Sequence, residues 1–128
     1  MYMYVGSDVS AVGSNLMQAA GSVFMVETAP GVKYIRDYAF ESCSKLFDVK
    51  LQYGLESIGG HAFGGCSSLT GLMIPNGVTS IGDSAFQVCS GLKNVTIGNG
   101  VTSIENNAFY GCSSLTSVTI PDGVTHIG

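Results

Sequence analysis

Charge is scarce in this sequence, and basic residues are the scarcest. Of the 128 residues, 11% are Asp, Glu, Lys or Arg, whereas a typical soluble domain has about 25%. Only five are Lys or Arg, and the formal net charge is −4. Because binding to nucleic acid requires clustered Lys and Arg, the composition argues against a nucleic-acid partner. The same acidity disfavours docking on anionic membranes.

Long hydrophobic runs are missing as well. A transmembrane helix needs about 20 apolar residues, and no stretch of the sequence approaches that length, so we expect no membrane insertion. Residues 1–5 lack the basic region and the continuous apolar region of a signal peptide. The length allows one domain, and a hydrophobic content of 45% is enough for a core.

Glycine is in excess, and an internal repeat explains it. Glycine makes up 18 of the 128 residues, about twice the usual share. The cysteines recur every 23 residues, as do Ala-Phe pairs and columns of isoleucine, glycine and leucine. The cysteines are Cys43, Cys66, Cys89 and Cys112, and the pairs begin at Ala39, Ala62, Ala85 and Ala108. Residues 31–122 are therefore four repeats of 23 residues, and residues 123–128 begin a fifth.

Each repeat contains short local signals. Apolar and polar residues alternate over 117–120, which predicts a strand with one buried face. The sequence Pro121-Asp122-Gly123 predicts the turn after it. Over 106–112, an asparagine N-cap followed by apolar residues predicts one short helical turn. The repeat thus contains a strand, a turn, a second extended piece and a short helix.

One such repeat cannot bury its apolar face alone, so the repeats must stack into a solenoid. Equivalent strands then pair in parallel about 4.8 Å apart, and each apolar column becomes an interior ladder. Ladders and tight turns leave few positions for charge and require glycine where φ is positive. The predicted fold class is an α/β solenoid with a short parallel sheet on one side and short helical or 3-10 turns on the other.

The repeat resembles a leucine-rich repeat of the BspA-like class, named for a bacterial surface antigen. The matching residues are Leu115-x-x-Val118-x-Ile120-Pro121, Val124-x-x-Ile127-Gly128 and Ile81-Gly82-x-x-Ala85-Phe86-x-x-Cys89-x-x-Leu92. Arg36 and Glu105 depart from this pattern at a glycine position. The resemblance covers residues 31–128 and implies a right-handed leucine-rich-repeat coil whose sheet lines the concave side. It also implies a secreted or cell-surface adhesin of the kind that binds host matrix proteins or neighbouring cells.

The two ends of the sequence differ from the repeats. Residues 1–30 follow the repeat poorly, and we expect an N-terminal cap or a degenerate first repeat, with residues 2–5 as a candidate extra strand. The sequence stops six residues into the fifth repeat. We expect first a fragment of a longer array and second an end-to-end homo-oligomer, because an open strand edge favours association. A frayed end is the third alternative.

The cysteines are the most conspicuous candidate for chemistry. One cysteine per coil places the four in a line about 14 Å long, so they cannot share one tetrahedral zinc ion. Disulfides between adjacent coils fit the allowed Cα separation, but parallel Cβ vectors do not give the torsion that a disulfide prefers. Free cysteine is a small, readily buried hydrophobe. We therefore expect buried thiols and no metal site, with disulfides as the alternative.

No motif indicates catalysis. His61 and His126 are nearly three repeats apart, and no serine lies in a nucleophile elbow. The glycine pairs beside His61 lack the lysine of a phosphate-binding loop. The carboxylates are scattered singly. We expect neither enzymatic activity nor a cofactor.

The outward strand positions are the candidate binding surface. Four of the five basic residues lie between residues 33 and 50, in the first coil. A surface of small polar residues with an aromatic or charged patch suits modest-affinity protein contact. The predicted ligand-binding residues are Phe47, Asp48, Lys50, Gln52, Met73, Asn94, Thr96, Ser117 and Thr119.

Two functional hypotheses follow. The first is a non-catalytic interaction module of a surface or secreted adhesin, which binds a protein or glycan through the concave strand face. The alternative is a structural spacer or assembly element that self-associates through exposed solenoid ends.

Overall fold

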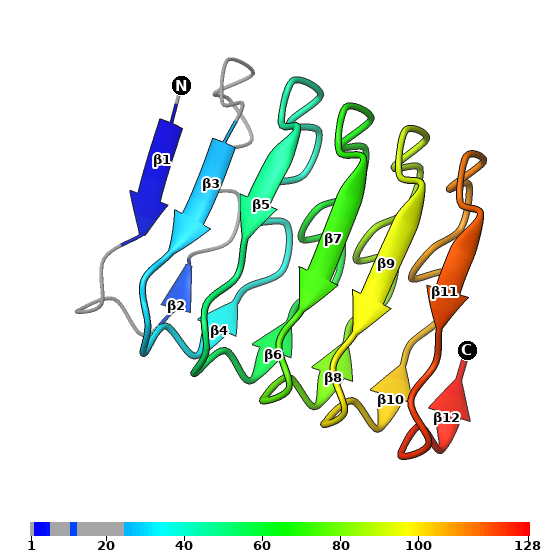
Figure 1. Ribbon diagram of the computed structural model, residues 1–128. Coiled ribbons are helices and arrows are strands. Elements are labelled where there is room, and N and C mark those ends of the chain that lie inside the picture. The colour runs from blue at the N-terminus through cyan, green and yellow to red at the C-terminus, as the bar shows by residue number, and fades with distance from the viewer. Residues whose placement is uncertain (1, 6–10, 13–24) are drawn as a thin grey trace.

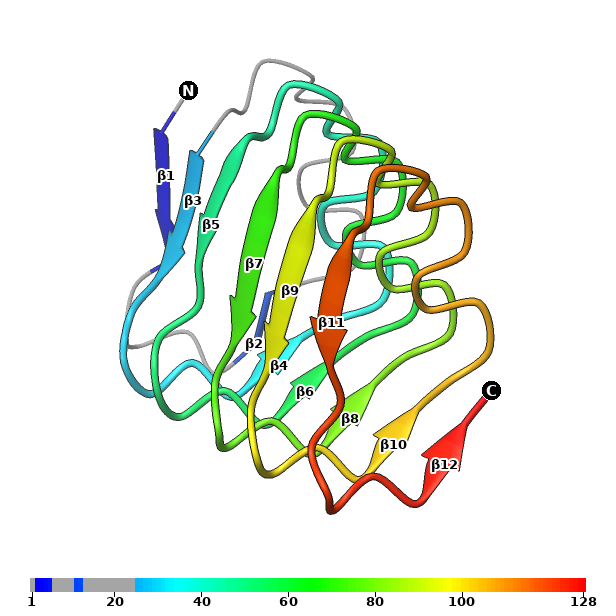
Figure 2. The same cartoon turned by 45° about the vertical axis from the view of Figure 1, so that its right-hand side comes forward.

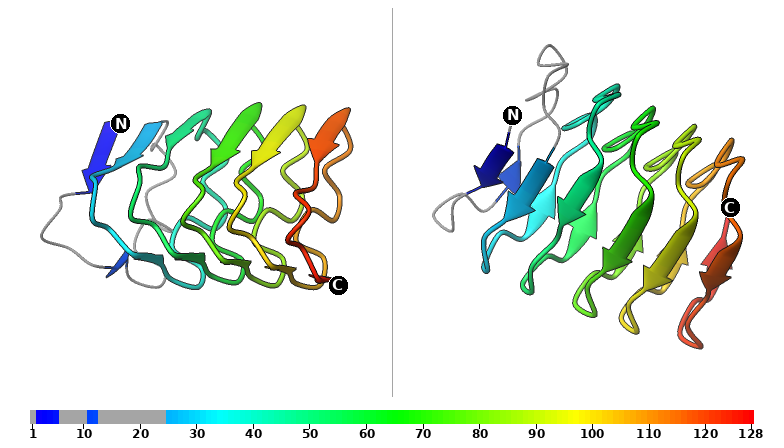
Figure 3. Two further views of the ribbon diagram at one scale, coloured as in Figure 1. Left: turned by 60° about the horizontal axis from the view of Figure 1, so that its bottom comes forward. Right: turned by 45° about the horizontal axis from the view of Figure 1, so that its top comes forward.

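A computed structural model describes residues 2–5, 11–12 and 25–128 of the chain. Over these residues the chain forms twelve short strands and no helix. The strands stack coil upon coil (Figures 1 and 2), and the first and last strands lie at opposite ends of the stack (Figure 3). The predicted solenoid of parallel strands is confirmed.

The first side of the coil is built from the longer strands. Where two of these strands pair, each residue lies opposite the one 23 positions away, for example Met25 opposite Asp48 and Asn94 opposite Ser117. The strands form two hydrogen-bonded groups, β1-β3-β5 and β7-β9-β11, and β5 lies beside β7 without belonging to the same sheet. Their outward side is called the long-strand face here. The strands are β1 (Tyr2–Val5), β3 (Met25–Thr28), β5 (Asp48–Lys50), β7 (Gly71–Ile74), β9 (Asn94–Ile97) and β11 (Ser117–Thr119).

The predicted second extended piece of each repeat is present, and it forms a sheet of its own that the sequence did not predict. Six two-residue strands pair in parallel in the order β12-β10-β8-β6-β4-β2. An isoleucine of each of four consecutive strands points into the core, while its neighbour faces outward. The outward side is called the short-strand face here. The strands are β2 (Ala11–Val12), β4 (Tyr34–Ile35), β6 (Ser57–Ile58), β8 (Ser80–Ile81), β10 (Ser103–Ile104) and β12 (His126–Ile127).

The third side corrects the predicted helical turn. Two repeat positions have positive φ, which a right-handed helix cannot accommodate, so the segment is a chain of turns. Alternate amides donate across to the next coil, as from Tyr38 N to Gly60 O at 2.9 Å and from Phe40 N to Ala62 O at 2.7 Å. The residues with positive φ are Tyr38, His61, Ser84 and Asn107 at one position, and Ser42, Gly65, Val88 and Gly111 at the other.

The core consists of the predicted ladders. Phe40, Phe63, Phe86 and Phe109 stack with ring centroids 5.3–5.4 Å apart. The first three are fully buried, as are Leu46, Leu69 and Leu92 and the isoleucines Ile35, Ile58 and Ile81 of the same coils. Aromatic rings at this spacing attract each other beyond the effect of burial alone. The interior therefore holds one coil in register with the next.

The last described coil departs from the predicted burial. Val118 and Ile120 are 37% and 48% exposed, whereas their equivalents Val95 and Ile97 are buried. The side chains occupy the same ladder positions, but a coil covers them on one side only. Leu115 is half-buried for the same reason.

Candidate binding surface

Two outward columns run along the long-strand face. The ladder register aligns Gly71, Asn94 and Ser117 in one column and Met73, Thr96 and Thr119 in the other. Asp48 and Lys50 of β5 occupy the same two repeat positions one coil earlier. β5 and β7 are neighbours whose contacts connect the two three-stranded groups. The columns therefore bring eight aligned positions onto one surface, and seven of them belong to the predicted ligand-binding set.

A hollow of about 380 Å³ lies where β5 and β7 adjoin. Gly71 opens this hollow because it carries no side chain, and a Cβ there would come within 3.3 Å of the Asn94 Oδ1. Phe47 and Met73 line it and are 50% and 70% exposed. The remaining lining residues are Asp48, Val49, Thr70, Leu72, Asn94 and Thr96.

The structure divides the predicted ligand-binding residues into two groups. Phe47, Asp48, Met73, Asn94 and Thr96 gather around the hollow. The other four are not among its lining residues: Lys50, Gln52, Ser117 and Thr119. The backbone amide of Gln52 donates to the Thr28 Oγ1 at 3.0 Å, which ties the end of β5 to the preceding coil.

The cysteine column lies in the core except at its last member, and the four cysteines form no disulfide with one another. Cys43, Cys66 and Cys89 are buried and Cys112 is half-buried. Three of the thiols donate to a phenylalanine carbonyl 26 residues earlier, as from Cys89 Sγ to Phe63 O at 3.2 Å. Burial raises the pKa of the Cys43 and Cys66 thiols, and a hydrogen bond with the Cys112 thiol, together with burial, raises the pKa of Cys89. These protonated thiols are therefore poor nucleophiles and poor metal ligands.

His61 lies on the third side of the coil, in contact with the coil before it. Its ring stacks on Tyr38 with the centroids 4.8 Å apart, and its Nδ1 lies 3.5 Å from the Glu41 Oε2. This local contact holds the first two repeats together. Cys66, five residues later in the sequence, is fully buried in the core.

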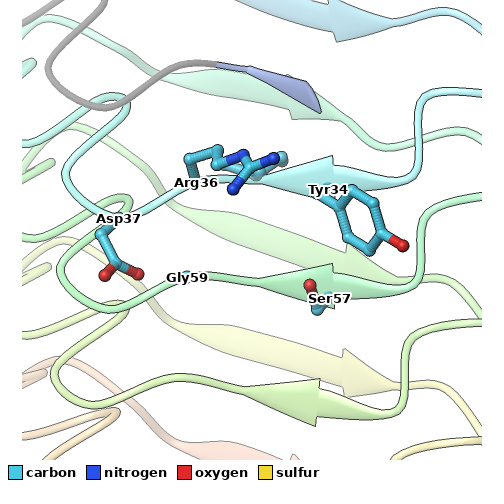
Figure 4. Close-up of a pocket in the computed structure, with 6 residues that line it drawn as sticks. Tyr34, Arg36, Asp37, Ser57 and Gly59 are labelled. Carbon is cyan, nitrogen blue, oxygen red and sulfur yellow. The ribbon is translucent and has the colours of Figure 1, made fainter. Parts of the chain in front are cut away.

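The short-strand face carries a hollow that the sequence did not predict. It has a volume of about 400 Å³ and lies between the first two repeats, as Figure 4 shows. Tyr34 and Arg36 project there from the first repeat, and Ser57 and Gly59 lie opposite in the second. The sequence contains a signal for this hollow: Tyr34 stands where the next repeats have serine, and Arg36 stands where the next two repeats have glycine.

Among residues 2–5, 11–12 and 25–128, no three His, Cys, Asp or Glu side chains gather where they could hold a metal ion. In the same ranges no helix has the length and apolar character needed to cross a bilayer.

Comparison with known proteins gives consistent matches. Residues 11–128 match the family described as the BspA type leucine-rich repeat region, in six copies. A leucine-rich repeat protein of T. pallidum is similar with a TM-score of 0.90 and 27% identity, over 99% of this chain and 68% of that one. A leucine-rich cell surface protein of Faecalibacterium prausnitzii A2-165 is similar with a TM-score of 0.66 and 29% identity, over 99% of this chain and 43% of that one. The pneumococcal vaccine antigen PcpA has the same fold, with a TM-score of 0.86 and 24% identity, over 100% of this chain and 36% of that one. No curated protein sequence matches significantly.

Proposed function

Because the chain belongs to the BspA-type leucine-rich repeat family, as its repeat motif indicated, we propose that it is a protein-interaction module that binds its partner through the long-strand face. The observation that carries this proposal is the hollow between β5 and β7, with Phe47 and Met73 exposed along it. The repeats provide a rigid surface, and the first two provide its most distinctive side chains.

The chemistry of the hollow supports a protein partner. Exposed aromatic and methionine side chains are enriched at the centres of protein interfaces, where a few residues contribute most of the binding energy. Met73 adapts its shape to a partner because its side chain is unbranched and flexible. Asp48 and Asn94 add polar groups beside these apolar side chains. Small neighbours such as Gly71 let a partner side chain reach the sheet surface.

The proposed setting is the cell surface, where the module would act as an adhesin. The F. prausnitzii protein that shares the repeat fold is described as a cell surface protein, and this similarity supports the proposal. The module needs no catalytic residue for such a role. Adhesion through a non-catalytic surface also agrees with the burial of Cys43, Cys66 and Cys89.

Residues 1–30 fit this scheme as a degenerate first repeat. β1 pairs with β3 and β2 pairs with β4, each at the same interval of 23 residues as in the later repeats. The family match begins at residue 11. A divergent first repeat would cover the first regular coil and keep its core from solvent.

Binding to immobilised matrix proteins tests the proposal. The purified chain is passed over surfaces coated with fibronectin, fibrinogen or collagen, and affinity is measured by biolayer interferometry. The test variant combines Phe47→Thr and Met73→Thr, because threonine stands at the equivalent positions Thr70 and Thr96 and should preserve the fold. Loss of two interface anchors is expected to weaken binding at least about tenfold.

The control variant is Tyr110→Gln, which removes a 63% exposed aromatic side chain from the third side. Glutamine stands at the equivalent position in the previous repeat, Gln87. This variant should bind like the unmodified chain. Unchanged binding by the double variant would contradict the long-strand face as the contact surface. Absence of binding to all three coated proteins would contradict the proposed adhesin role.

A further inference from the structure

The hollow on the short-strand face is not used by the proposed function. It lies on a different side of the coil from the long-strand face, and Tyr34, Arg36 and Asp37 surround it from the first repeat. Ser57 and Gly59 of the second repeat form its floor. Its volume of about 400 Å³ lies within the range of small-molecule sites, about 300–1,000 Å³.

The hollow exists because the first repeat differs from the next ones. The outward position of Tyr34 is serine in β6, β8 and β10, with which it is aligned. The position of Arg36 is glycine in the two following repeats, at Gly59 and Gly82. Two large side chains therefore stand beside a flat floor of serine and glycine. Similar side chains at every repeat would have filled this space.

The polar groups around the hollow have capacity left for a ligand. The Arg36 guanidinium lies 5.9 Å from the centre of the Tyr34 ring, a cation–π contact. Neither of the ion pairs among the described residues involves Arg36, and a guanidinium has five N–H donors. The Asp37 Oδ1 accepts a hydrogen bond from Gly60 N at 2.7 Å, and a carboxylate has about four acceptor sites.

Gly59 forms part of the floor of the hollow and leaves room for Asp37. A Cβ on Gly59 would lie 2.5 Å from the Asp37 backbone nitrogen and 2.6 Å from its Oδ1. Glycine at this position lets the Asp37 carboxylate lie close to the second repeat. The carboxylate and the guanidinium then flank the same open surface from two neighbouring positions.

We infer that the hollow formed by Tyr34, Arg36, Asp37, Ser57 and Gly59 binds a neutral saccharide. Sugar hydroxyl groups both donate and accept hydrogen bonds, which matches a site with guanidinium donors on one side and carboxylate acceptors on the other. The apolar C–H face of a sugar ring packs on an aromatic side chain such as Tyr34. An acidic ligand would be attracted by Arg36 but repelled by Asp37, and a basic ligand the reverse, so neither gains a net attraction from the two charges. A purely apolar ligand would desolvate both charges without compensation.

Saturation-transfer NMR with the methyl glycosides of glucose, galactose and mannose tests this inference. Glucuronate and glucosamine serve as the acidic and basic comparison ligands. The test variants are Tyr34→Ser and Arg36→Gly, which introduce residues that the later repeats carry at these positions. We expect at least one neutral glycoside to bind the unmodified chain, and each variant to bind it about tenfold more weakly.

The matched control is Tyr53→Asn, which removes a 74% exposed tyrosine of the same repeat outside the hollow. Asparagine is the equivalent residue at Asn76 and Asn99. This variant should bind the glycoside like the unmodified chain, and circular dichroism establishes that all three variants fold. The inference is overturned if no neutral glycoside binds, if only a charged sugar binds, or if Tyr34→Ser and Arg36→Gly leave binding unchanged. Because the long-strand face is untouched by these variants, the result is independent of the proposed protein binding.

Discussion

Removal of one phenylalanine from the middle of the stacked column should destabilise the solenoid strongly. Phe63 is fully buried and stacks on two rings, Phe40 at 5.3 Å and Phe86 at 5.4 Å. A buried Phe→Ala substitution lowers the free energy of unfolding by about 3–5 kcal/mol. An aromatic pair contributes about 0.5–1.5 kcal/mol beyond the effect of burying its surface. With two pairs lost, Phe63→Ala should fall at the upper end, about 4–5 kcal/mol.

Phe109 is the internal comparison, because it occupies the same repeat position at the end of the column. It is half-buried and stacks on Phe86 alone among the described residues. With one pair and part of the burial lost, Phe109→Ala should cost about 2 kcal/mol. The expected difference between the two sites therefore comes from neighbours in the stack and not from the residue type.

Urea unfolding followed by circular dichroism measures both free energies. Domains of this size have a total stability of about 5–15 kcal/mol, so Phe63→Ala removes a large share of it. Phe63→Leu, which keeps most of the side-chain volume, provides a milder variant if the alanine variant does not fold. Equal losses at positions 63 and 109 would refute the view that each coil is stabilised chiefly by contact with its neighbours.

Three further predictions concern the backbone and the thiols. Gly100→Ala should lower the melting temperature, because a Cβ there would collide with the Asn76 carbonyl oxygen. Gly123→Ala at the equivalent position should be nearly neutral, since the closest contact of its Cβ would be 3.7 Å. Similar melting temperatures of the two variants would contradict this packing. Val88→Gly should raise the free energy of unfolding by about 0.5–1 kcal/mol, because Val88 has a φ of 59°. The cost of this left-handed conformation for a branched residue exceeds the extra chain entropy that glycine has in the unfolded state. A lower midpoint of urea unfolding for the variant would disprove the strain. Because the buried thiols keep a raised pKa when folded and lose protons near pH 8.5 when unfolded, their stabilising contribution is complete below that pH. Above pH 8.5 this contribution to the free energy of unfolding should fall by up to about 1.4 kcal/mol per pH unit for each thiol. A free energy of unfolding that stays constant between pH 8 and 10 would exclude this linkage.

The fold could largely be predicted from the sequence because its signals repeat. Columns of identical residues at one fixed interval predict stacking without knowledge of any single contact, and the cysteine and phenylalanine ladders are interior as expected. β1 over residues 2–5 was also expected and is present. The helical turn was wrong because positive φ falls on residues such as Tyr38, His61 and Val88, whose identities carry no signal for a left-handed conformation.

The candidate site was predictable only in part. Alternation along each strand places Phe47, Asp48 and Met73 on the outward side, and the structure gathers them at one hollow. The separation of the long strands into two groups between β5 and β7 depends on backbone geometry that no residue pattern specifies. The hollow beside Tyr34 and Arg36 lies outside the predicted strand face, although the departure from the repeat at both positions indicates it.

Site-specific photocrosslinking tests the central claim most directly. A photoreactive amino acid replaces Met73 on the long-strand face in one sample and Tyr110 on the third side in another. Each chain is bound to a matrix protein that it recognises and is then irradiated. The proposed binding mode predicts crosslinks to the partner from position 73 and none from position 110. Crosslinks from position 110 alone would contradict it.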